Sequence, residues 1–324
     1  MPPSISVVIN NYNYGTYLGS AIESALGQDY DGIVQTIVVD DGSTDHSRQV
    51  LSQYAGRITA VLKENGGQAS ALNAGVRASS GDILCFLDAD DWWAPGKLTS
   101  VVAEFRSDPR CSLVYHRLQP VRADGTPTLK PIPRTLCRGD LQRRLERSAG
   151  WWPFPMTSAV AVRRAAWEAA GDIPETFRIS ADAWLVGIYP FLGRVAASPD
   201  SLGFYRLHQN HWYRETDDAA MLQRRMAHWA STVEATNTFL AHRGGTGRLS
   251  IDDHLPYQVA RARLQGADLR ACVRLTLKGL TFGGEPNHLR RARDVARALA
   301  AFRAGALMER EARAGADRAR AGHP

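Results

Sequence analysis

Short apolar runs alternate with amphipathic segments over the first 120 residues. The apolar runs, rich in β-branched and aliphatic residues, cover 5–9, 33–39, 58–62, 83–87 and 113–115. Between them, apolar residues at helical spacing predict helices over 16–26, 44–54, 68–78 and 96–105. Strands that are apolar throughout and separated by helices predict an α/β fold, with a mostly parallel sheet covered by helices on both faces.

The pattern changes beyond residue 118. Residues 118–157 are rich in Pro, Arg and Trp and predict mostly loop; a strand over 158–162, helices over 164–170 and 181–192, and a strand over 202–207 follow. From 216 onward, an apolar seam at alternating steps of four and three predicts a long helix; its members are Leu222, Met226, Trp229, Val233, Thr236 and Leu240. We expect this seam to fold back onto the first domain, with a homodimer contact as the alternative.

These patterns predict three regions. The first is a domain over 1–215, with halves 1–117 and 118–215, and a helical region over 216–304 follows it. The Ala/Arg/Gly-rich tail over 305–324 is predicted to be flexible.

Composition narrows the class of protein. Of the 324 residues, 44% are hydrophobic, which is enough to form a sizeable buried core, and 22% are charged. No apolar run approaches the roughly 18 residues of a membrane span, and the start of the chain lacks the pattern of a signal peptide. Four widely spaced cysteines without a CxxC pair favour the cytoplasm over a disulfide scaffold or a zinc finger.

The net charge of +6 is concentrated behind residue 215. Residues 1–215 hold 21 Lys/Arg and 22 Asp/Glu, whereas residues 216–324 hold 18 and 11. A nucleic-acid reader usually carries its basic charge in the module that binds, so we expect no nucleic-acid partner. The basic region fits a solvated helical surface, an anionic partner, or a peripheral contact with anionic lipid on the inner face of a membrane.

The segment Leu87-Asp88-Ala89-Asp90-Asp91 ends the fourth apolar run. Three carboxylates within four residues repel one another unless a cation or hydrogen-bond donors share them. Their hard oxygens suit Mg²⁺ or Mn²⁺, and such an ion there would neutralise a leaving diphosphate. The alternative is an Asx turn with a helix N-cap, before a helix that Pro95 opens.

Three further segments lie at strand ends or before a helix. Asp40-Asp41-Gly42-Ser43 offers a carboxylate to a pyrimidine N–H or to ribose, or forms a turn in which Ser43 caps the next helix. Asn10-Asn11-Tyr12-Asn13 offers the face of Tyr12 to a base. Asn65-Gly66-Gly67 precedes a helix whose N-terminus favours an anion. The chain lacks GxxxxGK[ST] and GxGxxG, which argues against an NTPase or a dinucleotide-dependent dehydrogenase.

In this order the four segments resemble family 2 glycosyltransferases, and the resemblance covers residues 4 to about 210. It implies the GT-A fold and an inverting transfer from a nucleotide-diphosphate sugar, most often UDP-linked. It also implies a divalent metal, Mn²⁺ or Mg²⁺, held on the diphosphate by Asp90. The residues implied for binding the donor nucleotide are Asn10, Tyr12, Asp41, Asn65, Gly67, Asp88 and Ala89.

The resemblance also implies a general base. Ile179-Ser180-Ala181-Asp182 is similar to a segment in which the family usually has an acidic pair, and here Ala181 replaces the first acid. Asp182 is then the implied base, because an acceptor hydroxyl must lose its proton as it attacks the anomeric carbon. The alternative is that Asp182 merely caps the helix that follows it.

Two further sets of residues have two interpretations each. Tyr205-Arg206-Leu207-His208 is similar to the family's YRxH segment, which implies that His208 completes the metal shell. Arg206 would contact the diphosphate or pair with the aspartates. Aromatic faces stack on sugar rings, so a wall for the acceptor is one prediction for the tryptophans; a hydrophobic cover over the sheet is the other. These tryptophans are Trp92, Trp151 and Trp152.

Three functions compete for this sequence. An inverting glycosyltransferase acting on an unidentified acceptor leads. A non-catalytic nucleotide-sugar-binding or scaffold protein is the alternative, because of Ala181 and the basic tail. A sugar nucleotidyltransferase would need a cationic phosphate loop after the first strand, and residues 10–15 contain no cation.

Overall fold

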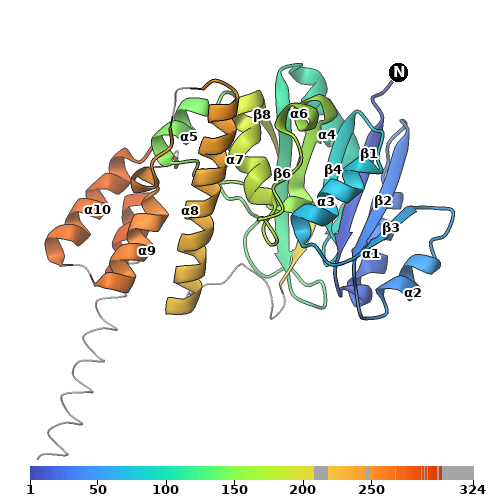
Figure 1. Ribbon diagram of the computed structural model, residues 1–324, viewed down its shortest axis with the longest axis horizontal. Helices are drawn as coiled ribbons and strands as arrows, with labels where there is room; N and C mark the ends of the chain where they lie inside the picture. The colour runs from blue at the N-terminus through green and yellow to red at the C-terminus, as the bar shows by residue number, and fades with distance from the viewer. Residues whose placement is uncertain are drawn as a thin grey trace, which may run out of the picture. The chain divides into compact units, whose positions relative to one another are not determined.

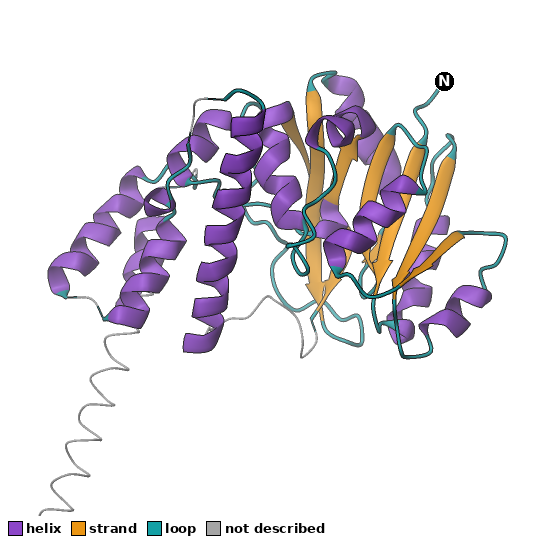
Figure 2. Ribbon diagram, in the orientation of Figure 1, coloured by secondary structure: helices purple, strands orange, loops and turns teal. Residues whose placement is uncertain are grey.

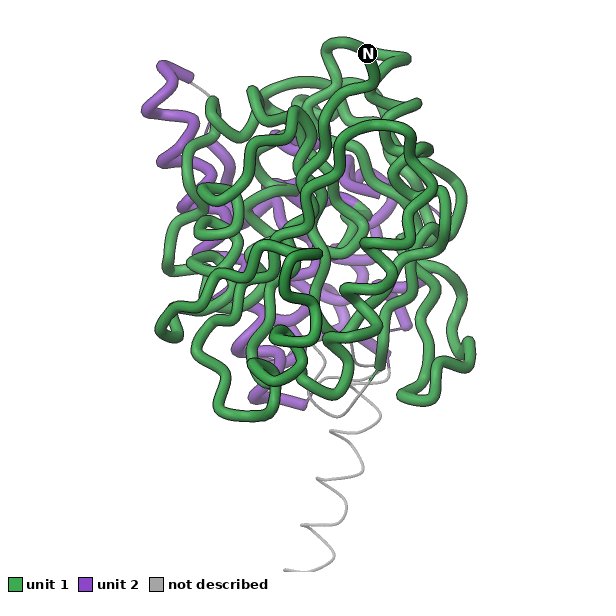
Figure 3. Tube along the Cα trace, turned by 90° about the vertical axis from the view of Figure 1, so that its right-hand side faces the viewer, with its two compact units in different colours: residues 1–143, 153–214 green, residues 144–152, 215–324 purple. Residues whose placement is uncertain are grey.

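The computed structural model describes residues 1–207, 218–245, 248–266, 268–285, 287, 289, 291–297 and 299–300. Two compact units divide the chain, one of residues 1–143 and 153–214 and the other of residues 144–152 and 215–324 (Figure 3). We call them the sheet unit and the helical unit. The segment 144–152 therefore belongs to the helical unit, although it lies inside the first region in sequence.

Figure 1 labels the main elements of the chain. In chain order they are β1 (Ile5–Asn11), α1 (Gly15–Leu26), β2 (Val34–Asp41), α2 (Ser47–Ser52), β3 (Thr59–Lys63), α3 (Gln68–Arg77), β4 (Ile83–Asp88), β5 (Trp92–Trp93), α4 (Lys97–Ser107), β6 (Cys111–Val121), α5 (Gln142–Ser148), η1 (Thr157–Ala159), β7 (Val160–Arg163), α6 (Arg164–Ala170), α7 (Asp182–Leu192), β8 (Arg194–Arg206), α8 (Ala219–His242), η2 (Ile251–Asp253), α9 (Leu255–Gln265) and α10 (Leu269–Thr281).

The predicted α/β fold is confirmed, with one sheet of strand order β3-β2-β1-β4-β7-β6-β8-β5. Strands β1 to β4 are parallel, whereas β7 runs antiparallel to both of its neighbours, β4 and β6. Helices lie on both faces of the sheet (Figure 2). Along β2, Val38 joins the core beneath α1 and α4, and its neighbours Ile37 and Val39 join the core beneath α3. Both sets of alternating side chains are buried here, which is why residues 37–39 of the strand are all apolar.

Several predicted local features are wrong. Helix α2 has only six residues and begins at Ser47, and the Ser43 hydroxyl accepts the amide N–H of Asn13 instead of capping that helix. Helix α4 starts at Lys97 after Gly96, which has a φ of +77°, so Pro95 lies outside the helix.

The stretch 118–157 is more ordered than its composition predicts. Strand β6 extends through Arg117, Gln119 and Pro120 as far as Val121, because its partner β8 continues beside it to Arg206. Helix α5 occupies Gln142–Ser148. These polar and proline-containing segments form regular structure through pairing and packing with residues that are distant in sequence.

The helical unit contains α8, α9 and α10. The seam of α8 packs within this unit: its Trp229 ring lies 5.0 Å from the ring of His254, next to α9. In the described part of the chain, no helix is long and apolar enough to cross a membrane. The predicted tail at 305–324 lies outside the described residues.

Helix α3 approaches the sheet through Gly75. A Cβ atom at this position would overlap the Val8 side chain and lie 3.1 Å from Cγ2 of Val39. We expect Gly75→Ala to lower the free energy of unfolding by about 1–3 kcal/mol, the range for an overpacked core. Urea denaturation followed by tryptophan fluorescence measures this change.

Gly19→Ala is the matched control, because on α1 the new Cβ would meet only the Tyr54 hydroxyl at 3.4 Å. It should leave the stability unchanged or raise it through helix propensity. Equal stability of the two variants would contradict the close packing of α3.

Candidate active site

The register of the parallel strands brings the polar strand ends together. Asn10 on β1 pairs with Asp88 on β4, and Asn11 pairs with Asp40 on β2. The Asn11 amide donates to the Asp40 carboxylate at 3.0 Å, and Arg48 contacts the other oxygen at 3.2 Å. Asp40 is therefore fully buried and stabilises the ends of these strands. These strand ends form the edge of the sheet where ligands of parallel sheets bind.

Asp41 occupies the anion site that precedes α3. Its carboxylate accepts the backbone N–H of Gly66 at 3.0 Å and of Gly67 at 2.7 Å, and Lys63 Nζ donates to it at 2.6 Å. The next amide, of Gln68, donates to the carbonyl of Arg178. The anion attracted to this helix N-terminus is thus the protein's own carboxylate, and the expectation of a ligand anion there is corrected.

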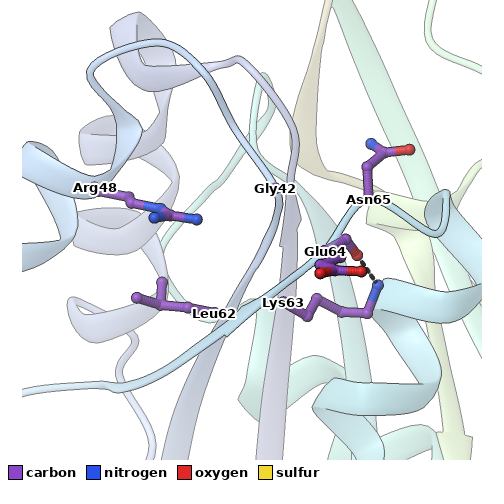
Figure 4. A pocket seen from close by; sticks show the side chains of 6 residues that line it. All are labelled: Gly42, Arg48, Leu62, Lys63, Glu64 and Asn65. Atoms are coloured by element: carbon purple, nitrogen blue, oxygen red, sulfur yellow. Dashed lines mark hydrogen bonds between the residues drawn. The ribbon is translucent and has the colours of Figure 1, made fainter.

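A cavity of about 490 Å³ opens beside Asp41. Figure 4 shows its lining residues, which come from the turn after β2, from α2, from the end of β3 and from the segment after it: Gly42, Arg48, Leu62, Lys63, Glu64 and Asn65. Asn65 is fixed by two contacts, since its amide donates to the Asp41 carbonyl and its oxygen accepts from Arg178. Of the predicted residues, Asn65 therefore lines this pocket, and Asp41 contacts Asn65 through its carbonyl.

The three aspartates of the Leu87–Asp91 segment have different surroundings. Asp91 is buried and accepts the Ser158 hydroxyl at 2.6 Å and the Arg206 amide at 3.0 Å. Burial, and then the neighbouring charge of Asp90, raise its pKa well above the usual range. Burial, Asp90 and then Asp182 also raise the pKa of Asp88, to about 7.

This carboxylate group fits a hard divalent cation. Asp91 is held by protein donors, so the half-buried Asp88 and Asp90 are the residues that would hold such a cation. Oδ1 of Asn10 is buried without a hydrogen-bond partner, although the side chain contacts Asp88. No cluster of three or more His, Cys, Asp or Glu able to hold a metal occurs among the described residues. One or two carboxylates completed by phosphate oxygens and water are the usual Mg²⁺ arrangement.

Asp182 lies in the first turn of α7. The N-cap residue is Ala181, so Asp182 does not occupy the N-cap position that the alternative assigned to it. Burial raises the pKa of its carboxyl to about 6, against the opposing effect of backbone hydrogen bonds from Ala183 and Thr157. Its charge also acts on Asp88, so the structure brings the aspartate segment and the predicted base into one site.

The Gln68 side chain joins these two groups. Its amide nitrogen donates to Asp88 at 2.9 Å and to Thr157 at 3.2 Å, and its oxygen accepts the Ala181 amide at 2.9 Å. Ser180, just before Ala181, has a φ of +58°. Backbone strain of this kind persists where the surroundings enforce it, and here Gln68 holds the strained turn that leads into Asp182.

The other predicted nucleotide residues differ in exposure. Tyr12 follows β1 and is 46% exposed, so its ring is open to a stacking partner. Ala89 is buried, and its amide donates to the Asn10 carbonyl at 3.2 Å. The Gly67 amide is used by Asp41, so Gly67 shapes the site through its backbone. His208 lies outside the described residues.

Arg206 is engaged within the protein. Its guanidinium donates to the carbonyls of Asp90 and Ala123 and lies over the rings of Tyr17 and Trp92. Of its two predicted roles, the contact with the aspartate segment is the one the structure has, through the backbone of that segment. The Trp92 ring also stacks on Phe204 at 4.9 Å, so its faces are used inside the protein and do not form the predicted acceptor wall.

Trp151 and Trp152 belong to the helical unit. The Trp151 ring packs on Phe282, with the Arg291 guanidinium 4.0 Å from its centroid. Trp152 has no exposed surface. The burial of Trp152 and the internal packing of the partly buried Trp151 do not support the predicted acceptor wall.

Sequence reasoning missed four contributors: Gln68, Thr157, Ser158 and Asp91 were assigned no role. Asp91 carried a signal as the third carboxylate of its segment, and Gln68 as the first residue after the paired glycines. Thr157 and Ser158 carried no comparable signal, because a 3₁₀ turn places them against β4 from about 70 residues away in sequence.

Comparisons with known proteins identify the family of this chain. The model of glycosyl transferase family 2 matches residues 6–169. An uncharacterized glycosyltransferase of Nostoc sp. is 34% identical over 78% of this chain and 81% of its own.

Two solved structures share the fold. S. aureus TarS, in complex with UDP-GlcNAc, aligns over 93% of this chain and 92% of its own with a TM-score of 0.55 and 16% identity. The mannosyltransferase PcManGT of Pyrobaculum calidifontis, in complex with GDP-Man and Mn²⁺, aligns over 96% and 80% with a TM-score of 0.53 and 22% identity. With a family model over half of its length and a relative matched across most of both sequences, the chain belongs to glycosyltransferase family 2 and has the GT-A fold.

Proposed function

We propose that the protein transfers a sugar from a nucleotide-diphosphate donor, a UDP-sugar in the first instance, to an acceptor hydroxyl with inversion at the anomeric carbon. The observation that carries this proposal is the juxtaposition of Asp88 and Asp182 across the Gln68 side chain. Asp88, on the side of the sugar donor, and Asp182, whose pKa is raised to about 6, would then share one site.

The donor side follows from the strand ends. The pocket beside Asp41 has the size for a nucleoside, with Lys63 and Arg48 in its lining. Tyr12 supplies an exposed ring for a base. The complexes of TarS with UDP-GlcNAc and of PcManGT with GDP-Man show both bases among proteins of this fold, so the base preference is a matter for direct measurement.

Asp88 and Asp90 would hold a divalent ion against the diphosphate. A bound Mn²⁺ or Mg²⁺ supplies Lewis-acid neutralisation of charge on the diphosphate. The protein's own part is to place the two carboxylates, and Asp91 does this by tying the segment to Ser158 and to the Arg206 backbone.

The displacement itself needs a base on the acceptor side. As the acceptor oxygen bonds to the anomeric carbon, the bond from that carbon to the diphosphate breaks and the hydroxyl proton passes to Asp182. A carboxylate with a pKa of about 6 is mostly ionised at neutral pH and still basic enough to take the proton.

Removing the base should slow turnover strongly while the sugar donor still binds. We expect Asp182→Asn to lower kcat by about two orders of magnitude or more, the scale of general-base catalysis. In the wild type, kcat/KM should rise with pH through about 6, because Asp182 must be ionised, and this limb should vanish in the variant.

Donor hydrolysis or transfer with a panel of acceptors provides the readout. Asp31→Asn, which removes an exposed carboxylate elsewhere in the sheet unit, is the control. Unchanged turnover in Asp182→Asn would refute the base assignment. Donor binding without any turnover in the wild type would favour the non-catalytic alternative.

Metal-dependent donor binding should require Asp90. A thermal-shift series with UDP, GDP, CDP and TDP, each with and without Mn²⁺, should show a rise of several degrees for one nucleotide with the metal, as expected for a saturating ligand. Asp90→Ala should lose the Mn²⁺-dependent part. The exposed Asp172→Ala is the control, and Mn²⁺-dependent stabilisation that survives in Asp90→Ala would contradict this ligand.

Gln68→Glu separates the two contacts of Gln68. The glutamate keeps an oxygen that can accept from the Ala181 amide. It loses the N–H group that donates a hydrogen bond to Asp88, and it adds a negative charge. We expect the donor KM to rise about tenfold, the loss of one hydrogen bond to a charged group. The pH limb should also shift upward, because nearby negative charge disfavours ionisation of Asp182.

Gln68→Leu removes both hydrogen bonds, and we expect it to lower kcat as well. Gln49→Glu adds the same charge on the exposed side of α2 and serves as the control. A purely structural role for Gln68 would leave the pH limb in place, and that result would overturn the proposed link.

A further inference from the structure

Helix α10 exposes an apolar stripe. Leu269, Val273, Leu277 and Leu280 follow one another at steps of four, four and three, which places them on one side of a helix. Their exposed fractions are 62%, 50%, 56% and 39%. Contiguous exposed aliphatic side chains of this kind mark interaction surfaces.

The orientation of α10 is set by a different face. Cys272 is buried, and a Cβ atom at Gly279 would lie 2.9 Å from Cα of Ala292, so this side packs closely within the helical unit. α10 also packs against α9, beside which it lies in Figures 1 and 2. The apolar stripe is therefore additional to the packed face.

A basic row runs beside the stripe. Arg270, Arg274 and Lys278 recur at steps of four, each one residue after a member of the stripe. The Lys278 ammonium reaches the Asp252 carbonyl at 2.7 Å and Asp253 at 3.8 Å. The exposed Arg270 and Arg274 have no ion pair within the described part of the chain.

We propose that α10 is a docking surface for an anionic lipid bilayer, with the apolar stripe in the acyl boundary and the arginines on lipid phosphates. A helix that exposes a row of aliphatic side chains next to a row of basic ones matches the boundary between acyl chains and anionic headgroups. A second copy of this helix, packed stripe to stripe, would bring its arginine row near another one, and that repulsion disfavours a dimer here. The proposal is independent of the transfer reaction.

Co-sedimentation of the full-length protein with lipid vesicles tests the proposal. Vesicles of phosphatidylcholine with about one-third phosphatidylglycerol should bind the wild type at low salt, and pure phosphatidylcholine vesicles or high salt should weaken binding strongly. Arg270→Gln combined with Arg274→Gln should bind about 30-fold more weakly, which corresponds to about 2 kcal/mol for two charges. Val273→Ser combined with Leu277→Ser should lose at least tenfold.

Matched controls lie in the sheet unit. Arg106→Gln combined with Arg143→Gln removes the same charge from exposed positions, and Ile33→Ser removes an aliphatic side chain that is 76% exposed. Both should bind vesicles like the wild type, and circular dichroism should show every variant folded.

Three results would overturn the proposal: no binding by the wild type, equal loss in the control variants, or a stripe variant that turns a dimer into a monomer without changing vesicle binding. The last result would assign the stripe to a second copy. None of these measurements depends on donor turnover, so they leave the proposed function untouched.

Discussion

Four carboxylates, those of Asp88, Asp90, Asp91 and Asp182, share partly desolvated surroundings at the carboxyl end of the sheet. Burial and the charges of neighbouring carboxylates raise the pKa of Asp88 to about 7 and that of Asp91 well above its usual range, and burial raises the pKa of Asp182 to about 6. Protein donors relieve this unevenly: Asp91 receives a hydroxyl and an amide, and Asp88 receives neutral amide groups. A cation on Asp88 and Asp90 is the compensation that the proposed reaction would bring.

The same principle operates at Asp41, with the opposite outcome. There the protein supplies its own cation, Lys63, and two backbone amides, so the carboxylate is fully compensated without a ligand. Arg178 and Gln68 then connect this compensated edge with the turn before Asp182. In the proposed reaction, binding of the donor and placement of the base would thus be linked through a few polar contacts between segments about a hundred residues apart.

The helical unit presents a contrasting surface chemistry. Its α8 seam and the Trp151 ring are used in internal packing, whereas α10 keeps four aliphatic side chains and two arginines turned outward. An enzyme that modifies a lipid-linked or surface-bound acceptor would gain from such a face, because docking would hold the enzyme near its acceptor. Arg270 and Arg274 are two of the basic residues that give residues 216–324 their positive charge.

Local sequence patterns predict the alternation of strands and helices over the first 117 residues, because residues buried on both faces of a sheet are mostly apolar and their periods are visible locally. They do not predict the extents of α2 and β6 or the short strand β5. The sequence also indicated the strand-end aspartates, since their carboxyl-end position follows from parallel strands. Tertiary contacts were needed to show that β7 is antiparallel, that Asp41 fills the anion site before α3, that Trp152 is buried and that Trp151 packs on Phe282. The fold likewise revealed Gln68 and Ser158, which meet Asp88 across 20 and 70 residues, and Thr157, which accepts a hydrogen bond from Gln68. Hydrogen-bond partners and burial depend on which segments meet in space, and no local pattern of residues encodes that meeting.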